Sequence, residues 1–275
     1  MEINCKIKKT YYILFLLFFN CLVYSSENVV KVISYNIHGL PPIFTKGNDK
    51  ERIKFIFENT YKKYDLILFQ ENWVYQNLLY SYFKNNFIIS DKTNFKRKNN
   101  PKRSSGLNII YNNIILEEHS QHLFKVCNGW LGNGSDCFAS KGFIQAVFNI
   151  DGYAVNLFLT HLDAGSSEND IFSRKKQLLN LESELMRVDN GGPVIVCGDF
   201  NIDYYSDNSL ILDFLVRNNL NIIKWEEKEV ASEMIDYVFF KNGIDANINL
   251  LDYGIDKTLL PYSDHPPIYF NFTID

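Results

Sequence analysis

The chain has 275 residues, a formal net charge of -4 at pH 7, and 46% hydrophobic against 22% charged residues. This composition supports a sizeable core and excludes a disordered chain or an array of membrane spans. The acidic balance also disfavours general nucleic-acid binding, because that affinity comes largely from cations that neutralise phosphates.

The N-terminal segment, residues 1–25, has the three parts of a secretory signal peptide. A lysine-rich start precedes an apolar run over residues 11–19, and the small residues Val23 and Ser25 follow it. The apolar run is shorter than the ~20 residues of a membrane-spanning helix. We therefore expect cleavage near Ser25 and a secreted or periplasmic protein. Loss of three lysines and one glutamate takes the formal charge of residues 26–275 from -4 to -6.

Apolar runs and helical periodicity predict many strands with a few interspersed helices. Strands are expected at residues 29–35, 65–69, 87–90, 107–111, 114–124, 142–150, 153–159, 193–197, 234–240, 247–253 and 268–272. Helices are expected at residues 50–64, 169–188 and 209–218. No repeat or linker divides the chain after residue 26, so we expect one α/β domain of two packed sheets with helices outside them. Periodicity alone also fits a single mixed sheet.

Of the five cysteines, Cys5 and Cys21 would leave with the signal peptide. Cys127 and Cys137 bracket a Gly/Asn-rich loop, and secretion makes a disulfide between them a reasonable expectation. Cys197 lies within a predicted strand and is interpreted as a small buried hydrophobic residue.

Polar side chains suited to metal binding or proton transfer stand where predicted strands begin or end. They are Asn36, Glu71, His161, Asp199, Asn201, Asp236, Asp264 and His265. Each alone has a simpler explanation, since Asn and Asp favour turns and a Glu can cap a helix. Their recurrence at strand ends predicts that packed sheets bring them together at one rim.

Oxygen ligands of this kind suit a hard cation such as Mg²⁺. Histidines beside such a cation can act as a general base toward water and stabilise charge on a phosphoryl oxygen. The sequence contains no Gly-rich nucleotide loop, GxSxG elbow or evident cysteine nucleophile that would indicate another chemistry. Metal-assisted attack of water on a phosphoester is therefore the predicted reaction class.

The ordered motifs SYN, QE, TH, GDFN and SDH resemble those of the endonuclease/exonuclease/phosphatase superfamily. That superfamily includes pancreatic-type deoxyribonuclease and the neutral sphingomyelinases, and the resemblance spans residues 29–272. It implies a four-layer α/β/β/α sandwich, formed by residues 26–275 as the catalytic domain, with the site at the rim of the two sheets.

The resemblance also implies a metal site. Glu71 would be the main Mg²⁺ ligand with Asn36 beside it, and Asp264 would support the metal or the neighbouring histidine. One or two ions would bind, with Mn²⁺ or Co²⁺ as possible substitutes.

The same resemblance assigns the catalytic groups. His265 would be the general base, oriented by Asp236, and Asp199 would help to position the attacking water. Asn201 and His161 would hold the phosphate and stabilise its transition-state charge. His38, in the NIHG stretch, is either a neighbour of the site or a loop residue, and we interpret it as a loop residue.

Two segments favour sphingomyelin or a related phospholipid as the substrate. We also expect a monomer that makes peripheral contact with the membrane. RSSGLNIIY at residues 103–111 and SKGF at residues 140–143 are similar to sphingomyelinase segments. Lys141 would bind substrate or brace the site, although a strand-edge lysine has a simpler role against sheet association. Residues 250–262 lack the aromatic membrane hairpin of haemolytic bacterial sphingomyelinases, for which Trp130 is an alternative interfacial anchor.

Other functions remain open. A secreted deoxyribonuclease-like enzyme would use the basic cluster at residues 92–103 as its phosphate-binding face, although a solvated loop is the simpler interpretation of that cluster. A phosphoinositide phosphatase usually has Leu where Phe200 stands. A toxin-like binding protein could keep this fold without the chemistry.

Overall fold

The computed structural model of the chain describes residues 28–40, 49–83, 87–89, 105–129, 133–188, 190–206, 208–225 and 233–275. The expected signal peptide, the basic cluster at residues 92–103 and Trp130 lie outside the described residues. Within the described ranges, no helix has both the length and the apolar character needed to cross a membrane.

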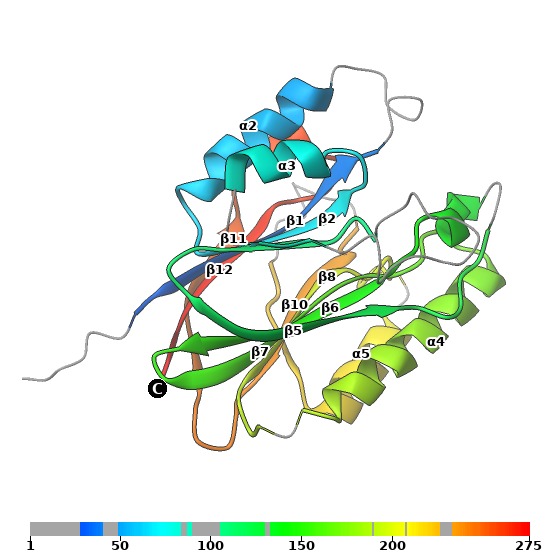
Figure 1. Cartoon of the computed structure of the whole chain (residues 1–275). Coiled ribbons are helices and arrows are strands. Elements are labelled where there is room, and N and C mark those ends of the chain that lie inside the picture. The colour runs from blue at the N-terminus through cyan, green and yellow to red at the C-terminus, as the bar shows by residue number, and fades with distance from the viewer. Residues whose placement is uncertain are drawn as a thin grey trace, which may run out of the picture.

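Two six-stranded sheets pack face to face in the described part of the chain (Figure 1). The first sheet has the order β11-β12-β1-β2-β4-β3. Its strands are β1 (Val30–Gly39), β2 (Leu66–Asn72), β3 (Phe87–Ile89), β4 (Asn108–Tyr111), β11 (Ile248–Ile255) and β12 (Ile268–Ile274). The parallel pair β1–β2 lies at its centre, so both strands end at the same edge.

The second sheet has the order β5-β6-β7-β8-β10-β9. Its strands are β5 (Ile115–Leu123), β6 (Gly142–Ile150), β7 (Tyr153–His161), β8 (Val194–Asp199), β9 (Asn221–Ile222) and β10 (Asp236–Lys241). The hairpin β6–β7 turns at the expected dipeptide, where Asp151 has a φ of 52° and Gly152 a φ of 91°. The central pair β7–β8 is parallel, as β1–β2 is in the first sheet.

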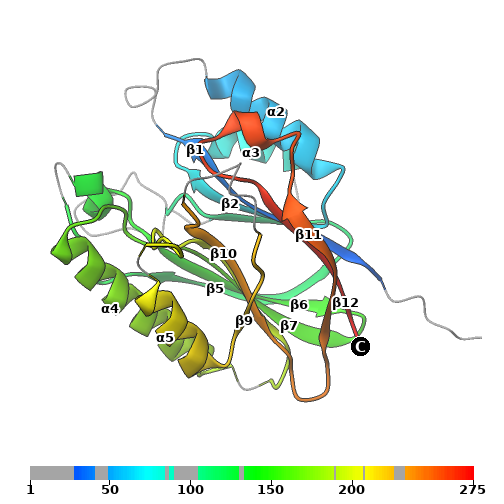
Figure 2. The ribbon, with the colours of Figure 1, turned by 180° about the vertical axis from the view of Figure 1, so that it is seen from behind.

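Helices cover the outer face of each sheet and complete the four layers. The pair α2 (Asp49–Tyr61) and α3 (Gln76–Phe83) lies on the first sheet, and α4 (Glu168–Leu185) and α5 (Ser209–Asn218) lie on the second. Figure 2 shows from behind that the short helix η2 (Leu260–Tyr262) sits beside α2. A second short helix, η1 (Asn133–Phe138), precedes β6. This arrangement is the α/β/β/α sandwich that the sequence predicted.

Alternation along the strands explains this layering. On β1, Val32 belongs to the large core between the two sheets, whereas its neighbour Ile33 belongs to the smaller core under α2 and α3. Strands buried on both faces read as continuous apolar runs, because successive side chains point to opposite sides of the sheet. On α4, Leu178 and Leu181 stand at helical spacing and pack on the outer face of the second sheet, as part of the same connected cluster.

Most predicted elements are present, with shifted ends. The helix expected at residues 169–188 begins one residue earlier, after a capping box in which Ser167 and Asp170 satisfy each other's backbone N–H groups. The sequence prediction missed α3 and the two-residue strand β9. Both are short, and eight residues or fewer carry too little periodicity to stand out.

Candidate active site

Strand register places three predicted residues in one row at an edge of the second sheet. His161 at the end of β7 is paired with Asp199 at the end of β8, and Asp236 at the start of β10 is paired with Asp199 from the other side. Gly198 permits the close approach, because its φ is 138° and an added Cβ would lie 1.9 Å from the Thr160 carbonyl oxygen. The Gly of GDFN is therefore required by the backbone.

The first sheet contributes its residues through an irregularity in β1. The register with β2 shifts between Asn36 and Gly39, where His38 takes a left-handed φ of 47°. Such bulges redirect side chains and are frequent beside active sites. Gly39 lies so close to β2 that a Cβ would meet the Glu71 carbonyl oxygen at 2.8 Å. Glu71 itself has a left-handed φ of 59°, a strained conformation that marks functional positions.

Phe200 turns back into the core between its two polar neighbours. It is fully buried, with ring centroids 5.1 Å from Phe239 and 5.5 Å from Tyr237. The backbone N–H of Asn201 donates to Asp199 Oδ1 at 2.9 Å. The buried ring thus fixes the turn on which the carboxylate and the carboxamide both depend.

His265 and Asp236 form a dyad at the rim. Asp236 Oδ2 lies 2.7 Å from His265 Nδ1, and His265 Nε2 lies 3.3 Å from Asn36 Nδ2 and 3.8 Å from Asp199 Oδ2. Burial lowers the pKa of His265, but the nearby carboxylates of Asp236 and Asp199 outweigh it and raise this pKa to about 11. The carboxylate at Nδ1 orients the ring so that Nε2 faces the other site residues.

Asp199 is the buried centre of the site. Asn36 Nδ2 donates to its Oδ2 at 3.0 Å, and His161 Nε2 lies 3.4 Å from the same oxygen. Burial raises the pKa of Asp199 to about 6, an increase that the charge of His265 opposes and that of Asp236 reinforces. A carboxylate held at this depth is poised to share protons or a cation with its neighbours.

Glu71 contributes a carboxylate with one buried oxygen to the site. Its Oε2 is buried and has no hydrogen-bond partner among the described residues. Burial raises the pKa of Glu71. The charge of Lys141 opposes this increase, and the charge of Asp199 adds to it. Ligand atoms of Glu71, His161 and Asp199 lie within 4.8 Å of one another. This donor set, with its unsatisfied carboxylate oxygen, fits a divalent cation.

His38 belongs to the site, so its interpretation as a loop residue is wrong. Its Nδ1 lies 3.2 Å from Asp264 Oδ2 and 3.8 Å from Glu71 Oε2. A hydrogen bond with Asp264 raises the pKa of His38, and burial opposes this increase. Burial raises the pKa of Asp264, but His38 and His265 outweigh it and bring this pKa to about 2. The only sequence signal was its position two residues after Asn36, on the same side of an extended strand.

Lys141 lies beneath the site with every ammonium proton directed to an acceptor. It is 4% exposed, and its Nζ lies 2.9 Å from His161 Nε2, 2.6 Å from the Leu162 carbonyl oxygen and 2.7 Å from Asp136 Oδ1. Burial and the charge of Lys141 hold the pKa of His161 well below its ordinary value. The contact with an ammonium, which can only donate, also favours the neutral imidazole. Asp136, which no motif indicated, is the counterion.

All the predicted site residues converge on one rim, with Lys141 just below it. Asn201 is also there, although its Nδ2 donates to the Leu162 carbonyl oxygen at 3.0 Å. Two face-to-face mixed sheets with such a rim are the architecture of a known family. Residues 33–265 match the model of the Endonuclease/Exonuclease/phosphatase family. The chain belongs to this family.

Relatives in sequence carry a narrower name. The chain is 27% identical over 296 residues to sphingomyelinase C 2 of Leptospira interrogans, an alignment that covers 89% of this chain and 46% of that protein. It is 25% identical over 166 residues to a sphingomyelinase of Mycobacterium tuberculosis, covering 52% of this chain and 33% of the relative. The aligned region thus spans less than half the length of these curated relatives.

Solved structures share the fold. A sphingomyelinase C from Streptomyces griseocarneus superposes with a TM-score of 0.69 at 16% identity, covering 89% of this chain and 99% of the other. A beta toxin mutant from Staphylococcus aureus with bound magnesium ions gives a TM-score of 0.65 at 18% identity, covering 90% and 100%. At these identities the likeness establishes the shared sandwich.

Proposed function

We propose that the protein is a secreted phosphodiesterase that depends on a divalent cation and hydrolyses sphingomyelin or a related phospholipid. The observation that carries the chemistry is the His265–Asp236 dyad, with its 2.7 Å contact, placed across Asp199 from the unsatisfied carboxylate oxygen of Glu71. A base and a cation-binding carboxylate in one rim are what metal-assisted attack of water on a phosphoester requires.

Glu71 would hold the cation, with Asn36 and Asp199 close by, and Mg²⁺ is the favoured ion because the donors are mainly oxygen. When bound, the cation would neutralise charge on the phosphate. Asp264 contacts His38 and would act on the site through that imidazole.

The protein's own groups would move the proton. Asp236 accepts from Nδ1–H of His265, which leaves Nε2 facing the site. The nearby carboxylates raise the pKa of His265 in the metal-free protein, and the charge of a bound cation would lower it again. With the cation in place, Nε2 would take a proton from the attacking water. The water oxygen then forms a bond to phosphorus, and the bond to the leaving alkoxide breaks. That alkoxide takes up a proton from solvent. Asp199, beside Nε2 of His265, would position the water, and Asn201 would face the phosphate. His161 was expected to face the phosphate as well, but its Nε2 is in contact with Lys141, so it would support the site through its place beside Asp199.

Two features support a lipid substrate. The relatives named above are sphingomyelinases, and the segments at residues 103–111 and 140–143 resemble that branch. Secretion is supported by the N-terminal pattern of residues 1–25.

The decisive experiment compares residues 26–275 on sphingomyelin vesicles, plasmid DNA and a soluble phosphoinositide, each with Mg²⁺ and with EDTA. We expect release of phosphocholine from the vesicles that requires Mg²⁺ and is lost in His265→Ala. Cleavage of DNA alone would reject the lipid substrate. Hydrolysis that persists in EDTA or in His265→Ala would reject the mechanism.

A further inference from the structure

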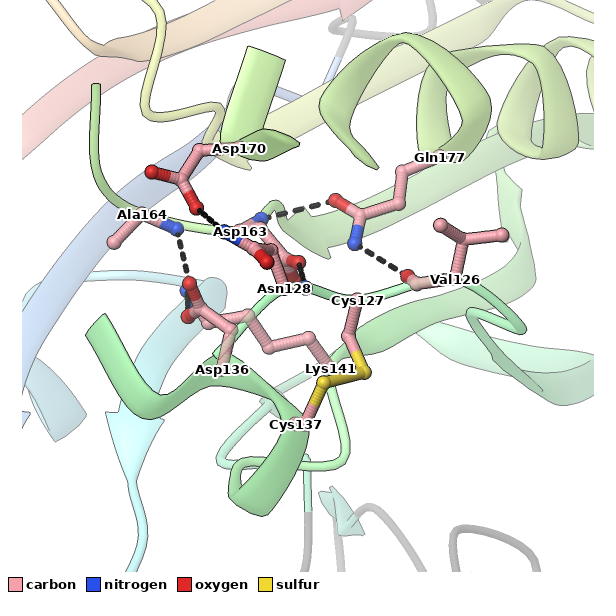
Figure 3. Close-up of a disulfide and its surroundings, with 10 residues drawn as sticks. All are labelled: Val126, Cys127, Asn128, Asp136, Cys137, Lys141, Asp163, Ala164, Asp170 and Gln177. Carbon is pink, nitrogen blue, oxygen red and sulfur yellow. Dashed lines mark hydrogen bonds and ion pairs between the residues drawn. A yellow bond between two sulfur atoms is a disulfide. The ribbon is translucent and has the colours of Figure 1, made fainter. Parts of the chain in front are cut away.

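The disulfide Cys127–Cys137 closes a loop that lies directly against the active site. Cys137 is 4% exposed and belongs to the short helix η1, next to Asp136. A backbone hydrogen bond from Cys137 to the Gly129 carbonyl oxygen, 3.0 Å long, also crosses the loop. Figure 3 shows the disulfide beside Lys141 and the segment that follows His161.

One arm of this loop ends in a single carboxylate that makes two buried contacts. Asp136 Oδ1 lies 2.7 Å from Lys141 Nζ, and its Oδ2 accepts from the backbone N–H of Ala164 at 2.8 Å. Asp136 and Lys141 are 2% and 4% exposed. A buried ammonium without its carboxylate would be an uncompensated charge, so the position of Asp136 determines that of Lys141.

The other arm holds the same segment from the opposite side. The backbone N–H of Asn128 donates to Asp163 Oδ2 at 2.8 Å, and the Asn128 side chain donates to Asp170 on α4. Gln177 of α4 accepts from the Asp163 N–H and donates to the Val126 carbonyl oxygen, both at 2.9 Å. The two arms thus hold Asp163 and Ala164, two and three residues after His161, and the disulfide joins the arms (Figure 3).

Lys141 connects the disulfide loop to the imidazole of His161, because it contacts both Asp136 and His161. An ammonium can only donate, so its 2.9 Å contact with His161 makes Nε2 the acceptor and leaves the proton on Nδ1. Nδ1 is buried and has no partner among the described residues. Lys141 is then the contact that selects this tautomer and fixes the ring against Asp199, which lies 3.4 Å from Nε2.

We propose that the disulfide-closed loop is a positioning clamp for His161, in which Cys127–Cys137 holds Asp136 against Lys141 and Lys141 fixes the imidazole in its Nδ1–H form. Asp136 and Lys141 are positioning residues that act through His161. The expected effect on turnover rests on the phosphodiesterase function proposed above, whereas the state of the imidazole does not.

The test uses ¹⁵N-histidine-labelled protein and two-bond ¹H–¹⁵N spectra, with the His161 signals assigned by a His161→Asn variant. We expect a single Nδ1–H tautomer in the oxidised wild type. In Asp136→Asn and in the Cys127→Ser/Cys137→Ser double variant, we expect signals averaged between the two tautomers. Ile211→Val is the control. Ile211 is a buried residue of α5, so its truncation should lower stability without changing the disulfide loop.

Activity provides the second measurement, made well below the melting temperature of every variant. We expect kcat to fall about 10- to 100-fold in Asp136→Asn and in the double variant, with KM nearly unchanged, since a small displacement of a catalytic group costs that much. The control should keep its kcat and its His161 spectrum.

Two outcomes would overturn the clamp: an Nε2–H tautomer in the wild type, or an unchanged His161 spectrum in folded Asp136→Asn. If Asp136→Asn does not fold, an unchanged His161 spectrum in the Cys127→Ser/Cys137→Ser double variant would overturn the clamp instead. A wild type inactive on every phosphoester, but with the expected change in tautomer, would reject the proposed function and support the clamp.

Discussion

Asp236→Asn tests the central dyad with a nearly isosteric change. The substitution keeps the shape of the side chain and removes the charge that faces His265 Nδ1 at 2.7 Å. The pKa of His265 stands at about 11 against an ordinary 6.5. At ~1.4 kcal/mol per pH unit this difference corresponds to roughly 6 kcal/mol, shared among three neighbouring carboxylates. Asp236 raises this pKa the most, so we expect it to fall by several units in the variant.

The sign of the effect on stability follows from the raised pKa. Stabilisation by the charged dyad is complete below the unfolded-state pKa of roughly 6.5, and it is lost as the pH rises towards about 11. The advantage of wild type over Asp236→Asn should therefore be largest at neutral and lower pH. Denaturant melts at pH 6, 8 and 10 in EDTA would measure this trend.

For activity, we expect kcat of Asp236→Asn to fall about 10²- to 10⁴-fold, because the base loses both its orientation and its charge partner. Initial rates on sphingomyelin vesicles with saturating Mg²⁺ measure the loss, and ¹⁵N-histidine titration in EDTA follows His265 directly. Asp252→Asn on the outer part of β11 is the matched control. A kcat within threefold of wild type, or a wild-type His265 that titrates near its ordinary pKa, would refute this reasoning.

Three further changes separate binding, packing and charge. Glu71→Gln should weaken Mn²⁺ binding, measured by calorimetry, at least ~10-fold. It should also raise the stability of the metal-free protein at pH 7, since burial raises the pKa of this carboxylate. An unchanged Mn²⁺ affinity would contradict the role of Glu71 as a metal ligand. Phe200→Ala should lower the free energy of unfolding, measured by urea melts, by about 3–5 kcal/mol, because the ring is fully buried. Phe200→Leu should lower it by less than ~1.5 kcal/mol. Equal losses in the two variants would contradict the packing argument. Asp256→Asn should cost about 1–3 kcal/mol at pH 7. Burial raises the pKa of Asp256, but hydrogen bonds from Lys63 and Tyr64 outweigh it and lower this pKa. The cost should therefore decrease as the pH falls below about 4 and vanish once the pH is below the lowered pKa of the folded protein. A cost that does not depend on pH would argue against the ion pair.

Local patterns in the sequence determined the strands and the identity of the rim residues. An apolar run that ends in GDFN, or one that follows SDH, carries both pieces of information within a few neighbouring residues. Turn chemistry did the same for the β6–β7 hairpin. The disulfide between Cys127 and Cys137 was also predicted from a loop of short separation. These features depend on period and composition, which a chain displays without being folded.

Only the tertiary structure decided which side chains touch. The alignment of His161 with Asp199 and Asp236 depends on strand register across three segments far apart in the chain. The place of His38 depends on a bulge in β1. Asp136 looked like one more polar loop residue, and it acquires its importance from the disulfide and the burial of Lys141. Register, bulges and buried charge pairs arise when distant segments pack, so no local pattern in the sequence specifies them.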